Sequence, residues 1–331
     1  MADKPHVLVL ATGGTIANPL DIEGYLTGRE LLDEVPEVEE VADVEIKDVA
    51  LTGSSGMTPE IWWDLHREIT EAAERDDPPA GVVVTHGSNT VEETAYFLHL
   101  TLETDMPVTL TAAQRNHRLI GNDGDRNLLD AVKVAASEEA RGRGALVVLN
   151  DEIHSARDVT KSATGRPDAW SSGNLGAVGL IDKRDNMEFL RRTEKRHAPD
   201  ALHDLSGTSA ADFPQVEIVY SAVGNDGTMV DAAVEAGADG IVVAALPTGS
   251  PAGPTDYDRT QQDAVQEAGD AGVPVALSTR AHEGWPYPKR REQYGVLWAN
   301  TLSPQKARIL LALGLMRTDD GEELQEFFAE F

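Results

Sequence analysis

The chain has 331 residues, more than a single hydrophobic core usually serves, so we expect a larger and a smaller domain. Its 57 Asp and Glu residues outnumber its 28 Lys and Arg residues, and the formal charge of -29 argues against nucleic acid as a direct partner because phosphate backbones are repelled. The absence of cysteine excludes disulfides, thiolate metal sites and a thiol nucleophile.

The acidic residues are spread along the whole chain, and only 8 of the 28 basic residues are Lys. In 1 M salt the Debye length falls to about 3 Å, which screens the repulsion between such charges. The composition therefore predicts a protein from a halophile; the alternative is an acidic mesophile protein. The first apolar segment, residues 7–11, is too short for a signal peptide or a membrane span, which predicts a cytoplasmic protein without a membrane partner.

Short β-branched runs alternate with amphipathic segments in the first part of the chain. This alternation predicts an α/β fold, with a large N-terminal domain in which helices flank a mostly parallel sheet. The expected strands are 7–11, 81–85, 107–111 and 145–150, and the expected helices are 59–75, 90–102 and 126–139.

Two of these helices begin with recognisable signals. Thr58 followed by Pro59 is typical of a helix start. Thr90 and Glu93 have the spacing of a capping box, in which each side chain satisfies a backbone N–H group at the helix start. We expect this capping box to fix the loop that precedes it.

The periodic pattern lapses between Arg191 and Asp212, which predicts an inter-domain linker. The predicted organisation is an N-terminal domain over 1–190 with most of the catalytic residues, a linker over 191–212, and a smaller C-terminal α/β domain over 213–331. The expected strands of the second domain are 216–220, 240–245 and 273–277, and its expected helices are 228–237, 257–270 and one that begins at Ser303-Pro304.

Hydroxyl side chains follow two of the expected parallel strands. One strand leads into Thr12-Gly13-Gly14-Thr15, and another leads into Thr85-His86-Gly87-Ser88. Because ligands of open parallel sheets bind at the carboxyl ends of the strands, this pattern predicts an active site there. The paired glycines lack the lysine of a phosphate loop and the third glycine of a dinucleotide motif. The alternative for the first loop is a tight strand-to-helix turn capped by Thr15.

The two segments resemble the signature motifs of the bacterial-type L-asparaginases, which include glutaminase-asparaginases. The matching residues are Ala11-Thr12-Gly13-Gly14-Thr15-Ile16-Ala17 and Thr85-His86-Gly87-Ser88-Asn89-Thr90-Val91-Glu92-Glu93-Thr94-Ala95, with further matches at Gly53-Ser54-Ser55-Gly56-Met57, Asn150-Asp151, Arg157-Asp158-Val159-Thr160-Lys161, Tyr294-Gly295 and Leu302-Ser303-Pro304-Gln305-Lys306-Ala307-Arg308. The resemblance implies a homodimer or homotetramer in which active sites are shared between subunits.

The resemblance also implies a role for individual residues. Thr15 matches the nucleophile, Tyr25 the residue that hydrogen-bonds it, Ser88 the second catalytic hydroxyl, and Lys161 the lysine that partners Ser88. The implied substrate-binding residues are Ser54 and Ser55 for the substrate's α-carboxylate and Ala113 for the leaving amide. No cofactor and no metal ion are expected.

The residues suggest acyl transfer. A threonine hydroxyl is a weak nucleophile and needs a base within hydrogen-bond reach, for which Tyr25 and Lys161 are the two candidates. Lys161 can act as a base if burial lowers its pKa. His86 is a third candidate, but its position between the strand and Ser88 favours a hydrogen bond within the turn.

Two positions depart from the family pattern. Asn89 stands where the resemblance implies an aspartate that anchors the α-ammonium of the substrate, so weaker substrate binding is expected. Glu283 is the candidate for a glutamate contributed by the neighbouring subunit, although the local spacing differs; the alternative is a solvated loop residue.

The predicted function is hydrolysis of the side-chain amide of L-asparagine, with L-glutamine as a weaker substrate. One alternative is the ammonia-generating subunit of a tRNA-dependent amidotransferase, which the acidic charge and the lack of an extra N-terminal domain disfavour. The other alternative is a non-catalytic amino-acid-binding homologue, in which Asn89 has replaced a working carboxylate.

Overall fold

The structure is a computed structural model that describes residues 4–21 and 23–331. The chain divides into two compact units, one up to Ala210 and the other from Ala211 onward. This division falls inside the predicted linker of residues 191–212. Residues 191–210 group with the first unit, where the main-chain N–H of Leu202 donates to the carbonyl of Leu100 at 2.7 Å. The boundaries 1–190, 191–212 and 213–331 stay predictions for the functional domains.

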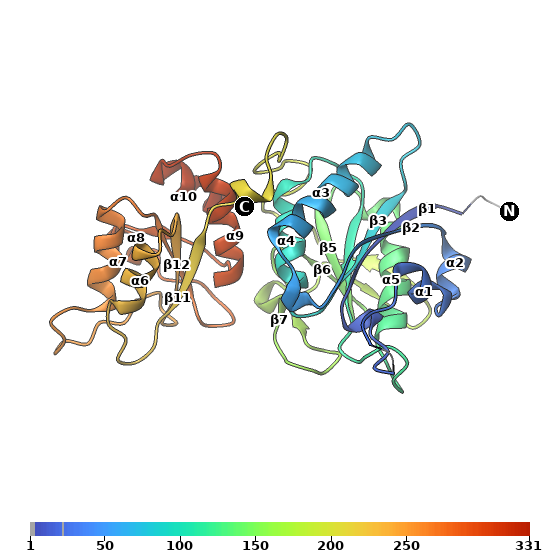
Figure 1. Cartoon of the computed structure of the whole chain (residues 1–331), viewed down its shortest axis with the longest axis horizontal. Helices are drawn as coiled ribbons and strands as arrows, with labels where there is room; N and C mark the ends of the chain where they lie inside the picture. Colours follow the sequence, from blue (N-terminus) through green and yellow to red (C-terminus); the bar gives the residue numbers. More distant parts are fainter. Residues whose placement is uncertain (1–3, 22) are drawn as a thin grey trace. The chain divides into compact units, whose positions relative to one another are not determined.

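The first unit is built on an eight-stranded sheet with the strand order β10-β9-β6-β5-β4-β3-β1-β2 (Figure 1). Strands β2, β1, β3, β4 and β5 run parallel, while β6, β9 and β10 are antiparallel. Their bounds are β1 His6–Gly13, β2 Asp43–Thr52, β3 Gly81–Thr85, β4 Val108–Thr111, β5 Ala145–Leu149, β6 Glu152–Ser155, β9 Gly179–Ile181 and β10 Met187–Phe189; β7 Thr160–Lys161 and β8 Trp170–Ser171 form a separate pair.

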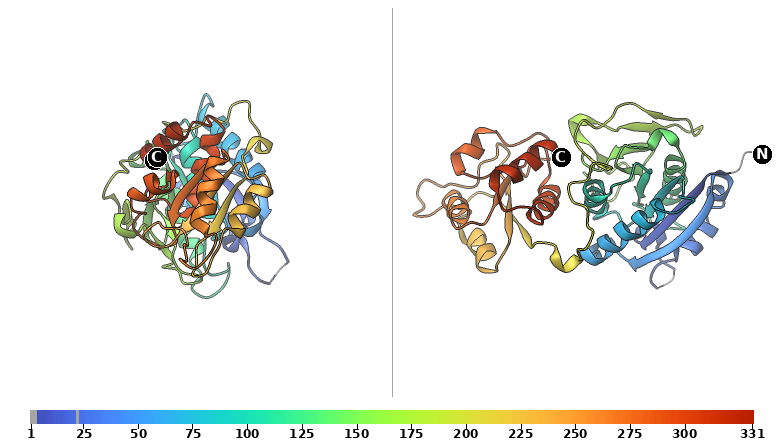
Figure 2. Two further views of the ribbon diagram at one scale, coloured as in Figure 1. Left: turned by 90° about the vertical axis from the view of Figure 1, so that its left-hand side faces the viewer. Right: turned by 90° about the horizontal axis from the view of Figure 1, so that it is seen from above.

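Helices cover both faces of this sheet (Figures 1 and 2). Helices α3 and α4 pack on one face, and α1, α2 and α5 pack on the other, where side chains from alternate positions of the strands join one core cluster. The helix bounds are α1 Gly28–Asp33, α2 Glu37–Val41, α3 Pro59–Ala73, α4 Val91–Thr101 and α5 Gly124–Ala135. The central parallel strands are therefore buried on both sides, which explains their continuous apolar sequences.

The order of the strands creates a place for a crevice at the carboxyl ends of β1 and β3. The chain passes from β1 to β2 on one side of β1 and then returns to β3 on its other side. At such a reversal the connections leave in opposite directions, so the carboxyl ends of β1 and β3 are open to a ligand. Thr15 lies two residues after the end of β1 and Ser88 lies three residues after the end of β3, at this position.

The second unit is a smaller α/β domain with a four-stranded parallel sheet in the order β11-β12-β13-β14. Helices α6 and α7 share a core cluster with one face of the sheet, while α9 packs against β11, β12 and β13 and α10 packs against α9 and β14. The bounds are β11 Val216–Tyr220, α6 Thr228–Glu235, β12 Gly240–Ala245, α7 Gln261–Asp270, β13 Val275–Thr279, α8 Lys289–Tyr294, β14 Leu297–Trp298, α9 Pro304–Leu315 and α10 Gly321–Glu330.

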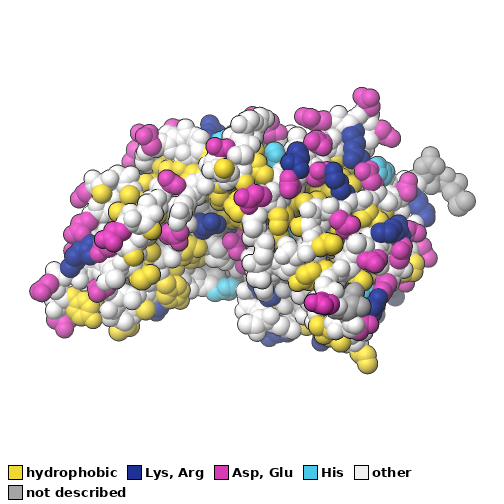
Figure 3. Space-filling model, in the orientation of Figure 1, with side chains coloured by type: hydrophobic (Ala, Val, Ile, Leu, Met, Phe, Trp, Pro, Cys, Tyr) yellow, Lys and Arg dark blue, Asp and Glu magenta, His cyan; other side chains and the backbone are white. Residues whose placement is uncertain are grey.

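The predicted fold class is confirmed: a large α/β unit with a mostly parallel sheet precedes a smaller α/β unit. Asp and Glu side chains are scattered over both units on the face shown in Figure 3, which agrees with their spread along the sequence. Within residues 4–21 and 23–331, no helix combines the length and the apolar character that crossing a membrane requires.

Candidate active site

Close glycine contacts bring together the loops that follow β1, β2 and β3. Gly14 has a φ of 83°, and a Cβ atom built on it would lie only 2.3 Å from the Cα atom of Gly87. A Cβ atom on Gly87 would lie 2.7 Å from the Cβ atom of Ser54. No larger residue fits at either glycine without moving the neighbouring main chain or Ser54, since both distances are below van der Waals contact. Thr15, Ser88 and Ser54 are therefore neighbours at the sheet edge.

Lys161 is the residue that the structure places directly on Ser88. Its Nζ donates hydrogen bonds to Ser88 Oγ at 2.8 Å and to Asn89 Oδ1 at 3.2 Å. Burial lowers the pKa of Lys161, and the negative charge of Glu92 partly opposes this change. Both of the acceptors that Lys161 contacts are neutral. Residue 89 is an asparagine and therefore supplies no negative charge that would stabilise the charged form of the lysine.

The Ser88 loop is tied to the loop after β2 through Ser54. The main-chain N–H of Asn89 donates to Ser54 Oγ at 3.1 Å, and Thr90 Oγ donates to the Ser54 carbonyl at 2.9 Å. The predicted capping box of Thr90 and Glu93 is therefore wrong, because the Thr90 side chain makes no capping hydrogen bond to α4. The hydroxyl serves the contact between loops instead, which fixes the same loop in a different way.

Thr15 is the first residue of a short 3₁₀ turn, η1 (Thr15–Ala17), and its side chain is half-buried. Within the part of the chain that the structure describes, its hydroxyl makes no hydrogen bond, neither to Tyr25 nor to Lys161. The main-chain N–H of Gly14 already donates to the Thr52 carbonyl at 3.0 Å. The Thr15 hydroxyl is thus available to a bound molecule at the open end of β1.

Tyr25 and Ser55 lie beside the same loop after β2. A Cβ atom on Gly53 would be 2.7 Å from the Tyr25 hydroxyl oxygen and 3.9 Å from Ser55 Oγ. Tyr25 belongs to the loop between η1 and α1, which is anchored where the Leu26 N–H donates to the Ala17 carbonyl at 2.7 Å. The anchored loop thus places the phenol of Tyr25 beside Gly53, the residue that precedes Ser54. The side chain of Ser55 is exposed.

Ala113 follows β4 and is fully buried. Gly124 lies between it and the Thr15 turn, because a Cβ atom on Gly124 would be 3.2 Å from Ala113 Cβ and 3.0 Å from Ile16 Cγ1. The predicted residues of the first unit thus converge at one edge of the sheet: Thr15, Tyr25, Ser54, Ser55, Ser88, Asn89, Ala113 and Lys161.

His86 is completely buried and is held from both ring nitrogens. Nδ1 donates to the Gly87 carbonyl at 2.8 Å, and Nε2 contacts Thr94 Oγ at 2.9 Å, which in turn accepts from Trp62 Nε1 at 2.8 Å. Burial lowers the pKa of His86 to about 4, so the ring is neutral near pH 7. The prediction that His86 hydrogen-bonds within the turn is confirmed.

Glu283, the remaining predicted site residue, does not belong to the first unit. It lies exposed in the loop between β13 and α8 of the second unit, and its role at a neighbouring subunit's site stays a prediction. Sequence reasoning missed Glu92, a buried residue of α4 whose Oε1 accepts the main-chain N–H of Lys161 at 3.4 Å. The motif contains Glu92, but nothing in the pattern indicates that its side chain turns inward.

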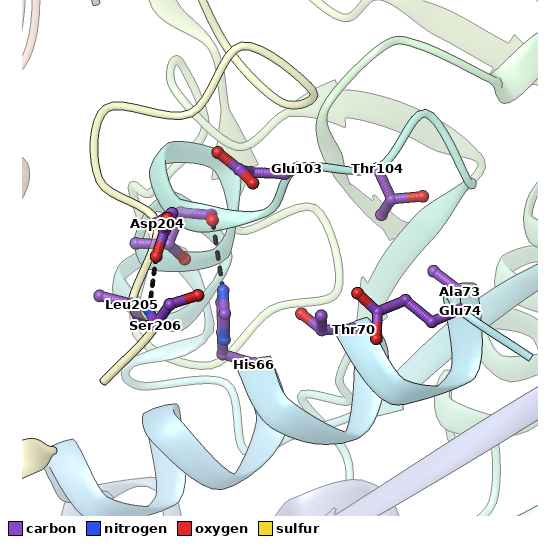
Figure 4. A pocket seen from close by; sticks show the side chains of 10 residues that line it. His66, Thr70, Ala73, Glu74, Glu103, Thr104, Asp204, Leu205 and Ser206 are labelled. Atoms are coloured by element: carbon purple, nitrogen blue, oxygen red, sulfur yellow. Dashed lines mark hydrogen bonds between the residues drawn. The ribbon is translucent and has the colours of Figure 1, made fainter. Parts of the chain in front are cut away.

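A separate pocket of about 270 Å³ lies in the first unit and contains none of the predicted site residues. Figure 4 shows its lining, which comes from α3 and the residue after it, from the end of α4 and the segment that follows, and from residues 204–206. His66 Nε2 contacts the Thr101 carbonyl at 3.2 Å there, and burial lowers the pKa of His66. In residues 4–21 and 23–331, no cluster of three or more His, Asp or Glu side chains is placed to hold a metal ion.

Comparisons with known proteins cover nearly the whole chain. Residues 6–195 match the asparaginase N-terminal family model, and residues 215–328 match the glutaminase/asparaginase C-terminal domain model. The chain belongs to the asparaginase family. The sequence is 38% identical to L-asparaginase 2 of Bacillus subtilis, covering 99% of this chain and 87% of that protein.

Other members of the asparaginase family are similarly close. The glutaminase-asparaginase of Pseudomonas fluorescens is 36% identical, with 98% of this chain and 90% of that protein covered. The crystal structure of a probable cytoplasmic L-asparaginase from Campylobacter jejuni superimposes with a TM-score of 0.90 at 37% identity, over 99% of this chain and 100% of that chain. The predicted resemblance to the asparaginase family is thereby confirmed.

Proposed function

We propose that this member of the asparaginase family hydrolyses the side-chain amide of L-asparagine to give L-aspartate and ammonia, with L-glutamine as a weaker substrate. As a member of the family, the protein is an amidohydrolase. Its relatives named L-asparaginase and glutaminase-asparaginase support both substrates. The observation that carries the proposal is the contact of Gly14 with Gly87, because it sets Thr15 beside the Ser88–Lys161 pair.

The proposed reaction proceeds through an acyl-enzyme. Thr15 Oγ attacks the amide carbon, the carbon–nitrogen bond breaks, and ammonia leaves with the proton that Thr15 gives up. Water then attacks the ester, which releases aspartate and restores the Thr15 hydroxyl. Main-chain N–H groups of Thr15 and Ser88 are proposed to stabilise the oxyanion, a contribution of about 3–4 kcal/mol per donor in hydrolases.

Two groups are proposed to move the proton. The phenol of Tyr25 is one candidate, and the Ser88–Lys161 pair is the other, supported by the hydrogen bond of 2.8 Å between them. The lowered pKa of Lys161 favours its neutral, basic form at a given pH. Substrate binding is assigned to Ser54 and Ser55 for the α-carboxylate, to Asn89 for the α-ammonium and to Ala113 for the leaving amide.

The decisive experiment compares ammonia release by the wild type and by Thr15→Ala, with L-asparagine and L-glutamine as substrates. Release by the wild type and loss of at least about 10³-fold in the variant support hydrolysis through Thr15. Binding of aspartate without turnover by either protein would favour a non-catalytic binder instead. Glutamine turnover only with an added partner and tRNA would favour an amidotransferase subunit.

We further propose that the acidic surface is an adaptation to high salt and that the protein is cytoplasmic. The charge of -29 supports the first statement, and the similarity to a probable cytoplasmic L-asparaginase supports the second. Activity and melting temperature measured from low salt to 3 M salt test the adaptation, which predicts that both rise with salt. Fractionation of the source cells tests the location.

A homodimer or homotetramer with shared sites is also proposed. The candidate for the residue shared between subunits is Glu283, which is exposed on its loop and so accessible to a neighbouring chain. Light scattering of the purified protein measures the number of subunits. Glu283→Gln should then reduce kcat without changing that number, and an unchanged kcat would contradict the assignment.

A further inference from the structure

Glu92 is a buried acidic residue that the proposed reaction does not use. It lies in the first turn of α4, and only 5% of the residue is exposed. One carboxylate oxygen, Oε1, accepts the main-chain N–H of Lys161 at 3.4 Å. The other, Oε2, is buried and has no hydrogen-bond partner among the described residues. A buried carboxylate oxygen without a donor is unfavourable, so its presence calls for an explanation.

Lys161 is consequently held at both ends. Glu92 contacts its main chain, while Ser88 Oγ and Asn89 Oδ1 accept hydrogen bonds from its Nζ at 2.8 and 3.2 Å. Ser88 and Asn89 lie in the loop that leads into α4, the helix that carries Glu92. The helix and its preceding loop therefore form one unit that fixes the position and direction of the lysine side chain.

The charges around Lys161 single out Glu92. The two groups that touch Nζ are neutral, and the neighbouring strand β8, with Trp170 and Ser171, offers no charge. Arg157 and Asp158, earlier in the same segment, pair with each other at 3.3 Å. The carboxylate of Glu92 is the group whose negative field acts on the Lys161 ammonium and opposes the decrease of its pKa by burial.

We infer that Glu92 is a positioning residue for Lys161: it anchors the main chain so that Nζ reaches Ser88, and it supplies the negative charge that the neutral Asn89 does not. This inference rests on the proposed function, in which neutral Lys161 serves the reaction through Ser88. An unpaired Oε2 fits the role, since a carboxylate neutralised by its own arginine or lysine exerts a weaker field on a second cation.

The inference predicts how the pH dependence responds to the loss of this charge. Without the carboxylate, less opposes the effect of burial, so the pKa of Lys161 decreases further. If neutral Lys161 is the active form, the acidic limb of kcat/KM then moves to lower pH. The Glu92 carboxylate and the Lys161 ammonium are partly buried but not in direct contact. For such a pair we expect the acidic limb of kcat/KM to shift by about one pH unit.

The test compares Glu92→Gln with the wild type, because glutamine retains an oxygen that can accept the Lys161 N–H. The matched control is Glu93→Gln, the same change at the next residue of α4. The pKa of Lys161 is measured by NMR on protein with ¹³Cε-labelled lysine, and the signal is assigned by its loss in Lys161→Met. A decrease of about one unit in Glu92→Gln and none in Glu93→Gln supports the inference. An unchanged pKa in Glu92→Gln overturns it.

Further variants test the charge and the contact separately, and Glu92→Asp covers the case in which Glu92→Gln does not fold. Asn89→Asp places a carboxylate on Nζ and should raise the pKa of Lys161, and adding Glu92→Gln to it should lower that pKa again. If the double variant titrates like Asn89→Asp alone, Glu92 supplies no charge to the lysine. Glu92→Asp keeps the charge but shortens the side chain, so kcat should fall with little change in the pKa of Lys161. An unchanged kcat in Glu92→Asp contradicts the positioning role.

The NMR measurement needs no turnover, which separates this inference from the proposed function. A wild type that releases no ammonia, yet whose Lys161 responds to Glu92→Gln, contradicts the proposed function alone. An active wild type whose Lys161 pKa and kcat/KM profile both ignore Glu92→Gln contradicts the inference alone. A shifted pKa with a shifted acidic limb supports both.

Discussion

The loops after β1 and β3 each bring a hydroxyl to the same edge of the sheet, but their surroundings differ. Ser88 is buried and accepts a hydrogen bond from Lys161 at 2.8 Å, while Thr15 is half-buried and its hydroxyl has no partner among the described residues. We call Ser88 with Lys161 the organised half of the site, because this hydroxyl already contacts a candidate base. We call Thr15 with its neighbour loop residue Tyr25 the available half, because the Thr15 hydroxyl is free to contact a bound molecule. The comparison indicates that the organised half transfers the proton and that the available half attacks the substrate.

The two halves depend on each other through the contact of Gly14 with Gly87, and breaking it should have the largest effect. In Gly14→Ala the new methyl group meets the main chain of Gly87 and the φ of 83° becomes unfavourable. We expect a loss of about 2–5 kcal/mol in the free energy of unfolding, measured by urea denaturation, together with loss of activity.

Gly24→Ala is the matched control for that prediction. Gly24 also has a positive φ, 97°, but nothing lies within 4 Å of a Cβ atom there. This variant should show only the conformational cost of about 1–2 kcal/mol. Equal losses in Gly14→Ala and Gly24→Ala would show that the close contact of the two loops is unimportant.

Removing the base from the organised half should have the next largest effect. Lys161→Met keeps an unbranched side chain as far as the ε position but removes Nζ and with it the hydrogen bonds to Ser88 and Asn89. General acid–base catalysis contributes about 10²–10⁴-fold, so kcat for asparagine should fall by at least about 100-fold while KM changes little. Lys47→Met, at a half-exposed lysine of β2, is the control. A decrease below 10-fold would assign the base role to another group.

Tyr25→Phe tests the available half. The variant retains the ring, which packs against the core, and loses only the hydroxyl that lies next to Gly53. We expect kcat to fall by about 10–100-fold, less than in Lys161→Met, because the phenol is one of two routes for the proton. Tyr220→Phe, at an exposed tyrosine of β11, should have no effect. If Tyr25→Phe is more damaging than Lys161→Met, the roles of the two halves are reversed.

Much of the fold could be predicted because the buried parallel strands have continuous apolar sequences. Strand β2 could not, since it lies at the sheet edge with β1 as its one neighbour and carries charged residues such as Glu45, Lys47 and Asp48. The sequence pattern predicts the start of α7 at residue 257, whereas the helix begins at Gln261, after a capping box of Thr260 and Asp263.

The site could be predicted in part for a related reason. Residues that lie within three positions of a strand end, such as Thr15 and Ser88, are placed by the topology of the sheet. Contacts between loops depend on which of several groups a side chain hydrogen-bonds in the folded chain, and the spacing of residues in the sequence does not determine that choice. Thr90 therefore binds the Ser54 carbonyl, 36 residues away, and not the start of its own helix. The inward direction of Glu92 escaped prediction for the same reason.

Asn89→Asp should have the smallest effect and the most specific one. Hydrogen bonds between two ionised groups are about twice as strong as neutral ones, so an aspartate facing the substrate's α-ammonium should lower KM for asparagine by about 3–10-fold. The same carboxylate would lie near Lys161 Nζ, now 3.2 Å from Asn89 Oδ1, and raise the pKa of that lysine. We therefore expect kcat near neutral pH to fall while KM improves.

Succinamate, which is asparagine without its α-ammonium, provides the matched control substrate for this variant. Its KM should not improve in Asn89→Asp, whereas its kcat should fall as it does with asparagine, because the effect on Lys161 is independent of the substrate. Equal changes in KM for the two substrates would mean that residue 89 acts only through Lys161. An unchanged KM for asparagine would place the ammonium elsewhere and leave Asn89 as a neutral partner of the organised half.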